Sequence, residues 1–353
     1  MDSLSSTLSA LFVALFAATV TASPLATPPP TVPTQVDAQP STAGRRFEVA
    51  AHWAPAIYQE TKSNADLITA FDFDGDWDGS NNAAHLATHP LYAVVYYTVA
   101  ETATHWFVTY VPYHPKDGKV PSGHDHDTEH ISLVVRKDGS PFGRLEAMET
   151  RFHKWMYQYA APGVAIGDGA DDVDGPIHLD EHGRPMVYAQ RSGHGLCGGQ
   201  SPTFVVDAFA LRCHHKETPH IEKRGVVYRY AGFAAVPRSL DDRDVGYALV
   251  EIGDTLWQHA RAAGPHLTFA SLIDFHGERC AEYDCPRGIG GVLAPQAGHD
   301  TTGMPWEEGG GRGVKSHGDA FFDPAFTLDK RLRFPHPFST KYLFNPYLGI
   351  GHF

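Results

Sequence analysis

The chain has 353 residues, of which 42% are hydrophobic and 12% aromatic, so it can bury a large core and is not a disordered or fibrous polymer. It carries 41 acidic residues against 28 Lys and Arg, and this excess without any basic run argues against nucleic acid as a partner. The 22 histidines motivate a search for a metal site, because imidazole is a common metal ligand.

The N-terminal part of the chain is expected to lie outside the folded domain. Residues 1–22 have the pattern of a signal peptide, with an apolar run at 8–20 followed by a small-residue cleavage site. That run is too short to span a bilayer, and no later segment is a candidate transmembrane helix. Residues 23–44 are rich in Pro, Thr and Ala and predict an extended linker. We therefore expect a secreted, extracellular protein with a single domain at residues 45–353.

The expected domain consists mostly of strands. Segments rich in Val, Tyr and Phe, each bounded by turn-forming residues, predict strands at residues 92–100, 105–113, 129–135, 144–150, 185–190 and 225–230. The best helix signal covers residues 245–262, where Val245, Leu249, Ile252 and Leu256 keep one apolar face. Gly- and Pro-rich loops follow. The sequence predicts a β-rich α+β fold with long loops and a few helices.

Four cysteines fit two disulfide bonds in a secreted chain. Cys280 and Cys285 can close a tight loop, and Cys197 with Cys213 a longer one, although counting alone allows the other pairings. Zinc is the rival use of these cysteines, because three histidines follow one of them closely, in the group Cys213, His214, His215 and His220.

An acidic run at residues 72–79 is a first candidate cation site. Counted from Asp74, acids stand at positions one, three and five, and Gly79 stands at position six, as in a calcium-binding loop. Position twelve is His85, where such a loop needs a bidentate Glu. An ion-free turn stays the alternative.

The sharpest local feature is the acidic, histidine-rich segment at residues 115–130. Asp127 and Glu129 stand two residues apart at the start of a predicted strand, so alternation points both carboxylates to one face. His124 can swing to the same side, and Asp117 enters from the preceding loop. Three converging carboxylates without a nearby Lys or Arg need compensation, which a divalent cation supplies most simply. Oxygen ligands with one imidazole suit Mg²⁺, Ca²⁺ or Mn²⁺, and a solvated acidic turn is the alternative.

Three motifs in this region resemble those of the necrosis- and ethylene-inducing-peptide-like proteins, or NLPs. They are Pro115-Lys116-Asp117, Gly123-His124-Asp125-His126-Asp127-Thr128-Glu129-His130 and Ser192-Gly193-His194-Gly195, within residues 92–196. The family has Arg and Trp where this chain has Asp125 and Thr128. The resemblance implies a β-sandwich core and a cytolysin that binds glycosphingolipid head groups on plant plasma membranes. It also implies that a divalent cation is bound by the same four side chains, Asp117, His124, Asp127 and Glu129.

Three functions follow from these motifs. The leading expectation is a secreted, necrosis-inducing-like protein that binds a sugar or lipid head group through its cation. The alternative is a metal-dependent hydrolase acting on a small polar substrate, with His194 or His126 as general base. His194 is exposed between two glycines after a predicted strand, where an ordinary turn histidine is equally expected. In the third function the cation only staples loops, so whether the chain is an enzyme stays open.

Overall fold

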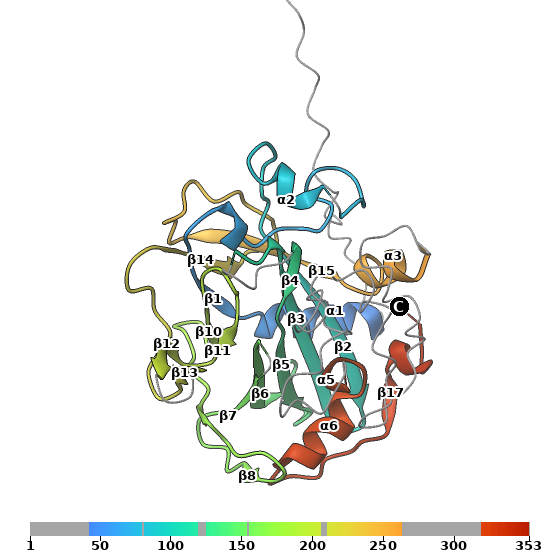
Figure 1. Cartoon of the computed structure of the whole chain (residues 1–353). Coiled ribbons are helices and arrows are strands. Elements are labelled where there is room, and N and C mark those ends of the chain that lie inside the picture. Colours follow the sequence, from blue (N-terminus) through green and yellow to red (C-terminus); the bar gives the residue numbers. More distant parts are fainter. Residues whose placement is uncertain are drawn as a thin grey trace, which may run out of the picture. The chain divides into compact units, whose positions relative to one another are not determined.

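One hydrogen-bonded sheet dominates the fold (Figure 1). The computed structural model describes residues 42–79, 81–118, 125–153, 155–205, 210–262 and 319–352. Eleven strands follow one another across the sheet in the order β11-β10-β1-β14-β15-β2-β3-β5-β6-β7-β9, while β17 pairs with β2 and β4 pairs with β3. This arrangement confirms the β-rich α+β class.

The strands of this sheet are β1 Ala56–Glu60, β2 Val94–Thr102, β3 His105–Lys116, β4 Asp125–Thr128, β5 Ile131–Arg136, β6 Arg144–Phe152, β7 Trp155–Ala160, β9 Gly175–Pro176, β10 Met186–Ala189, β11 Leu196–Cys197, β14 Gly225–Tyr230, β15 Val245–Glu251 and β17 Tyr342–Phe344. Two small sheets pair β12 Gln200–Val205 with β13 Ala210–His214, and β8 Gly167–Asp168 with β16 Leu332–Arg333. The helices are α1 Thr42–Trp53, α2 Asn82–His85, α3 Leu256–Ala262, α5 Asp319–Phe322 and α6 Pro324–Arg331, with short 3₁₀ turns η1 Asn64–Asp66 and η5 Pro346–Leu348.

Both faces of the central strands are buried. On β2, Val95 and Tyr97 belong to one core cluster, which α1 covers with Val49. Tyr96 points to the opposite face, where a second cluster includes Phe322 of α5. Because both faces are covered, the central strands are nearly continuous apolar runs, as expected of a sheet buried on two sides. This is why their positions could be predicted from composition.

The helix predicted at residues 245–262 is only partly correct. Val245–Glu251 is strand β15, which lies parallel to both neighbours, β14 and β2. The helix α3 begins at Leu256. A strand buried between two others carries apolar residues on both faces, and such a run can imitate the spacing of a helix.

The predicted signal peptide and most of the predicted linker lie outside the described residues, and α1 already begins at Thr42. Within the described ranges, no helix has both the length and the apolar character needed to cross a bilayer.

Candidate functional site

The three motifs meet at one end of strand β3. There β3 and β4 pair antiparallel, with His114 opposite Asp127. Beyond the end of β3, Gly118 donates its backbone N–H to the carbonyl of Ser192 at 2.8 Å. The loop that carries His194 is thereby fixed beside the acidic motif, although the two are separated by more than sixty residues of sequence.

The expectation that His194 is exposed is wrong, because the residue is fully buried between two buried carboxylates. Its Nδ1 is 2.7 Å from Asp127 Oδ2, and its Nε2 is 3.4 Å from Asp66 Oδ1. Burial alone would lower the pKa of His194, but the hydrogen bonds and negative charges of Asp127 and Asp66 outweigh it and raise the pKa to about 9. The ring therefore carries a positive charge at neutral pH. An imidazole that already holds its second proton is not suited to act as the general base of a hydrolase.

His114 supports this imidazolium from one side. The two rings stack at 3.7 Å with an interplanar angle of 4°, and His114 Nε2 donates to Gln59 Oε1 at 3.1 Å. Burial, together with the positive charge of His194, holds the pKa of His114 well below its usual range. The pair is thus a neutral imidazole stacked on a charged one.

Asp66 is a member of the site that sequence reasoning missed. Its Oδ2 accepts the backbone N–H groups of Lys62 at 2.7 Å and Ser63 at 2.9 Å, and its Oδ1 accepts that of Ser192. Burial raises the pKa of Asp66, but the bonds and charge of His194 and the two serine N–H groups lower it overall. Ser192 and His194 both have positive φ, at 67° and 50°, so Asp66 stabilises a loop with an unfavourable backbone.

Glu129 lies just after β4, at a short break between β4 and β5. Both strands pair with β3, and the pairs Tyr113–Thr128 and Tyr110–Ile131 keep the same register across the break. Pro112, which has no N–H to donate, is opposite Glu129 by this count. The backbone therefore retains the alternation that places Asp127 and Glu129 on one face.

The expectation that no basic residue approaches these carboxylates is wrong. Arg151, on β6, places its Nε 3.3 Å from Glu129 Oε2, and both side chains are 4% exposed. The backbone N–H of His153 donates to Glu129 Oε1 at 2.8 Å. Because Arg151 belongs to another strand of the sheet, its contact with Glu129 could not be predicted from the motif.

His126 faces away from Asp127. Its Nδ1 is 2.8 Å from the hydroxyl of Tyr113, and its ring stacks on Phe71 with centroids 5.2 Å apart. Asn82 donates to the same hydroxyl at 2.8 Å, so Tyr113 can donate its proton to His126. This position in the apolar cluster of the opposite face does not favour His126 as a general base for a cation held by Asp127.

The remaining two predicted ligands are Asp117 and His124. Asp117 directly follows β3 and is 5% exposed. His124 lies outside the described residues. The complete set of four cation ligands stays a prediction.

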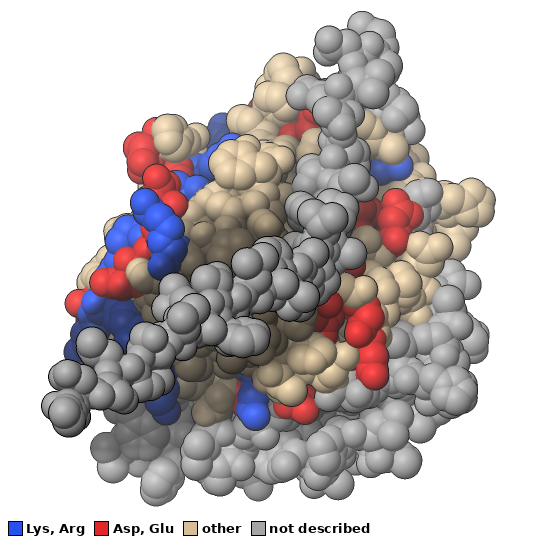
Figure 2. Space-filling view, turned by 90° about the horizontal axis from the view of Figure 1, so that it is seen from above, with Lys and Arg blue, Asp and Glu red and all other residues tan. Residues whose placement is uncertain are grey.

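Four carboxylates of this region are buried. Each of the four residues is at most 5% exposed, and they are Asp66, Asp117, Asp127 and Glu129. His194 lies between Asp127 and Asp66, and Arg151 lies beside Glu129. Carboxylate oxygens gathered at one place are the donors that a hard divalent cation prefers. On the surface, by contrast, acidic and basic side chains are interspersed along one edge of the face in Figure 2.

In the acidic run at residues 72–79, some of the carboxylates are hydrogen-bonded by groups of the run itself and of the residues just after it. Asp74 Oδ2 is 2.6 Å from Nδ1 of His85, the residue that occupies position twelve. Asp76 accepts the backbone N–H of Asp78 at 2.7 Å and the amide of Asn81 at 3.2 Å. These contacts favour the ion-free turn.

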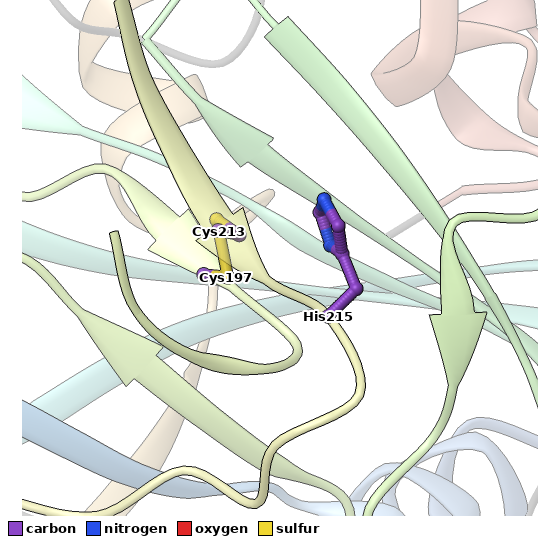
Figure 3. A group of neighbouring side chains, drawn as sticks. All are labelled: Cys197, Cys213 and His215. Carbon is purple, nitrogen blue, oxygen red and sulfur yellow. A yellow bond between two sulfur atoms is a disulfide. The ribbon is translucent and has the colours of Figure 1, made fainter. Parts of the chain in front are cut away.

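Cys197 and Cys213 form a disulfide bond, with their Cα atoms 6.0 Å apart, which confirms one of the pairings open to the sequence. His215 lies beside the sulfur atoms (Figure 3). A bonded Cys213 is not a thiolate, so the zinc alternative does not hold in this oxidised state. Cys280 and Cys285 lie outside the described residues.

Comparison with known proteins returns structures of NLPs. No protein-family model matches the chain, and no curated sequence matches it. A solved structure described as a toxin fold for microbial attack and plant defense is 19% identical, with a TM-score of 0.30. The match covers 45% of this chain and 70% of the chain in that structure. Necrosis and ethylene inducing protein 2 from the causal agent of cocoa's witches' broom disease is 14% identical, with a TM-score of 0.27, and the match covers 69% of this chain and 88% of that protein's chain. NLPPya in complex with mannosamine is 19% identical, with a TM-score of 0.25, and the match covers 46% of this chain and 70% of the NLPPya chain. These matches are distant and partial, and likenesses of this size assign no activity, which has to be argued from the chain's own residues.

Proposed function

We propose that this chain is a secreted, NLP-like protein that binds a divalent cation and, through it, the polar head group of a sugar or glycosphingolipid. The proposed ligands are Asp117, His124, Asp127 and Glu129. The observation that carries the proposal is the gathering of buried carboxylates at one end of β3, where Asp117, Asp127 and Glu129 are each at most 5% exposed. Buried charges require compensation, and oxygen-rich donors select Mg²⁺, Ca²⁺ or Mn²⁺ over softer metals.

The residues behind the proposed ligands orient them. His194 bonds one oxygen of Asp127 at 2.7 Å and so fixes the direction of that carboxylate. Asp66 in turn holds His194 and its loop, while Arg151 and His153 fix the carboxylate of Glu129. Such supporting contacts set ligand geometry and typically change metal affinity 10–100-fold when removed. A bound divalent cation would supply a Lewis-acidic centre that coordinates the hydroxyl groups of a sugar.

The hydrolase alternative receives less support. Its two candidate bases are His194, which is fully buried with both ring nitrogens facing the carboxylates of Asp127 and Asp66, and His126, which packs against Phe71 on the other face. The described residues therefore offer neither predicted base in a working position, and we propose binding rather than turnover.

Vesicle assays test the proposal. Vesicles with and without glycosphingolipid are loaded with a fluorescent dye, and sedimentation and dye leakage are measured with Ca²⁺, Mg²⁺ or Mn²⁺ and with excess chelator. We expect glycosphingolipid-dependent binding that chelator abolishes and that Asp127→Asn lowers at least about tenfold. Asp125→Asn, two residues away on the same strand but exposed, is the matched control and should bind normally. Equal binding with and without chelator, or no binding under any condition, contradicts the proposal.

A further inference from the structure

A second group of potential metal ligands surrounds the disulfide bond. Ligand atoms of Cys197, Cys213 and His215 all lie within 4.8 Å of one another (Figure 3). Both cysteines are at most 7% exposed, and the side chain of His215 is 19% exposed. Sulfur and imidazole are soft or borderline ligands, so this group differs in chemistry from the carboxylates around Asp127.

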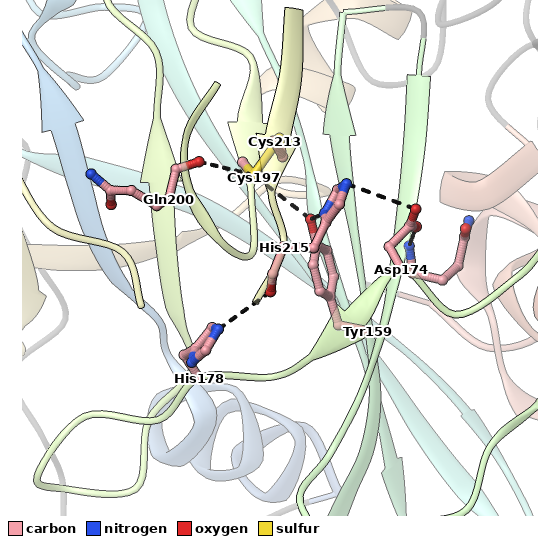
Figure 4. The surroundings of a disulfide bond; sticks show 8 residues. Tyr159, Asp174, His178, Cys197, Gln200, Cys213 and His215 are labelled. Carbon is pink, nitrogen blue, oxygen red and sulfur yellow. Dashed lines mark hydrogen bonds and ion pairs between the residues drawn. A yellow bond between two sulfur atoms is a disulfide. The ribbon is translucent and has the colours of Figure 1, made fainter. Parts of the chain in front are cut away.

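The imidazole of His215 is oriented by its neighbours (Figure 4). Its Nδ1 is 3.0 Å from the hydroxyl of Tyr159, which itself lies 3.9 Å from Cys197 Sγ. Its Nε2 faces Asp174 Oδ1 at 3.9 Å, while Asp174 Oδ2 accepts the backbone N–H of Gln158 at 2.7 Å. A carboxylate facing the second nitrogen of a histidine is the usual outer-shell arrangement at zinc sites.

We propose that reduction of the Cys197–Cys213 disulfide converts this group into a binding site for Zn²⁺ or a similar soft divalent cation, with the two thiolates and His215 as ligands. The disulfide and the metal site are then alternative states of the same side chains, selected by the redox conditions.

The reaction balances with a dithiol as reductant. The dithiol gives up two electrons and two protons and closes its own disulfide, while the bond between the sulfur atoms of Cys197 and Cys213 breaks and two thiols form. Binding of the cation then displaces the two thiol protons to solvent. With Zn–S bonds of about 2.3 Å in tetrahedral geometry, the two sulfur atoms need to separate to about 3.8 Å.

The backbone around the cysteines is held by contacts other than the disulfide. Cys197 pairs with Tyr188 of β10, and β13, which contains Cys213, pairs with β12. Between the cysteines, a Cβ added to Gly199 would lie 2.3 Å from the carbonyl oxygen of His214, so the turn passes the ligand segment more closely than other residues allow. A Cβ on Gly175, next to Asp174, would likewise meet the carbonyl oxygen of His215 at 2.8 Å. We therefore expect the ligands to stay close together after reduction.

Cobalt binding tests this proposal in the full chain. Cys280→Ser and Cys285→Ser remove the two other thiols, and a phosphine, which becomes the phosphine oxide with oxygen from water, reduces the remaining disulfide without chelating metal. Co²⁺ is the probe, because thiolate-to-cobalt charge transfer absorbs in the near ultraviolet and does not arise at a carboxylate site. We expect this absorption to saturate at about one equivalent in the reduced protein and to be absent from the oxidised protein, with Zn²⁺ displacing the cobalt.

Variants of the two adjacent histidines supply the control. His215→Ala should weaken Co²⁺ binding at least about tenfold, and Asp174→Asn should weaken it about tenfold through the outer shell. His214→Ala should leave it unchanged, because that side chain is 44% exposed and does not belong to the group. The proposal is overturned if the reduced protein shows no charge-transfer band, if His215→Ala and His214→Ala bind alike, or if circular dichroism shows that reduction unfolds the chain.

Discussion

Asp66→Asn is the substitution that most sharply tests how the site is built. The carboxylate accepts two backbone N–H groups at Oδ2 and that of Ser192 at Oδ1, and it faces the His194 imidazolium at 3.4 Å. An asparagine has the same shape but offers a single acceptor oxygen, so at least two of these contacts meet an amide N–H instead. Hydrogen bonds to charged groups contribute about 1.5–3 kcal/mol each, and breaking one side of a buried ion pair costs about 3–5 kcal/mol. We therefore expect a loss of about 3–5 kcal/mol in the free energy of unfolding.

Urea denaturation of the wild type and the variant, both in excess chelator, measures this loss without any contribution from a bound cation. Asp138→Asn is the control, because Asp138 is exposed and, among the described residues, its side chain accepts hydrogen bonds from Ser140 of its own turn, so its free energy of unfolding should change by no more than about 0.5 kcal/mol. A change below about 1 kcal/mol for Asp66→Asn would refute the view that this carboxylate organises the His194 loop.

Two further predictions concern the region of the disulfide. Burial lowers the pKa of His215 to about 4 in the folded chain, below the unfolded value of about 6.5. Between these two pH values the unfolded chain binds one more proton at this residue than the folded chain. Acidification from pH 6.5 to 4 should therefore lower the free energy of unfolding by up to about 3 kcal/mol. Burial raises the pKa of Asp174 to about 6, and this shift affects stability in the opposite direction. The measurement is therefore the difference in the free energy of unfolding between wild type and His215→Gln as a function of pH. Identical pH profiles of the two proteins would contradict the assignment. Breaking the Cys197–Cys213 bond, with a separation of 16 residues, should lower the free energy of unfolding by about 3 kcal/mol without loss of the folded state, and denaturation curves that coincide before and after reduction would contradict this.

The sheet could largely be predicted because its central strands are buried on both faces. Runs such as Val94–Thr102 and Ile131–Arg136 contain few polar residues, and turn-forming residues mark their ends. The same property misled the prediction at Val245–Glu251, where apolar residues on both faces of a strand matched helical spacing. Composition alone does not distinguish these two cases, because β2, one of the two strands that bury β15, comes from a distant part of the sequence.

The site could be predicted where its members are close in sequence or belong to one of the three motifs. The pattern around Asp127 and Glu129 gave the spacing of two carboxylates, and the His194 motif fell beside them. Asp66 and Arg151 reach the site through the tertiary fold, from η1 and from β6. For Asp66 the sequence held one local signal, the Ser63-x-x-Asp66 capping box, but this predicts a turn and not a contact with His194.

The cation content of the oxidised protein is the most direct measurement of the central claim. Three proteins are dialysed to equilibrium against Mg²⁺, Ca²⁺ and Mn²⁺ and then subjected to elemental analysis: the wild type, the double variant Asp127→Asn/Glu129→Gln and the control Asp125→Asn. The disulfide is kept intact, so that Cys197 and Cys213 do not bind metal. We predict about one equivalent of divalent cation in the wild type and the control, and none above background in the double variant, because it lacks two of the four proposed ligands. Equal cation content in all three proteins, or none in the wild type, would contradict the account.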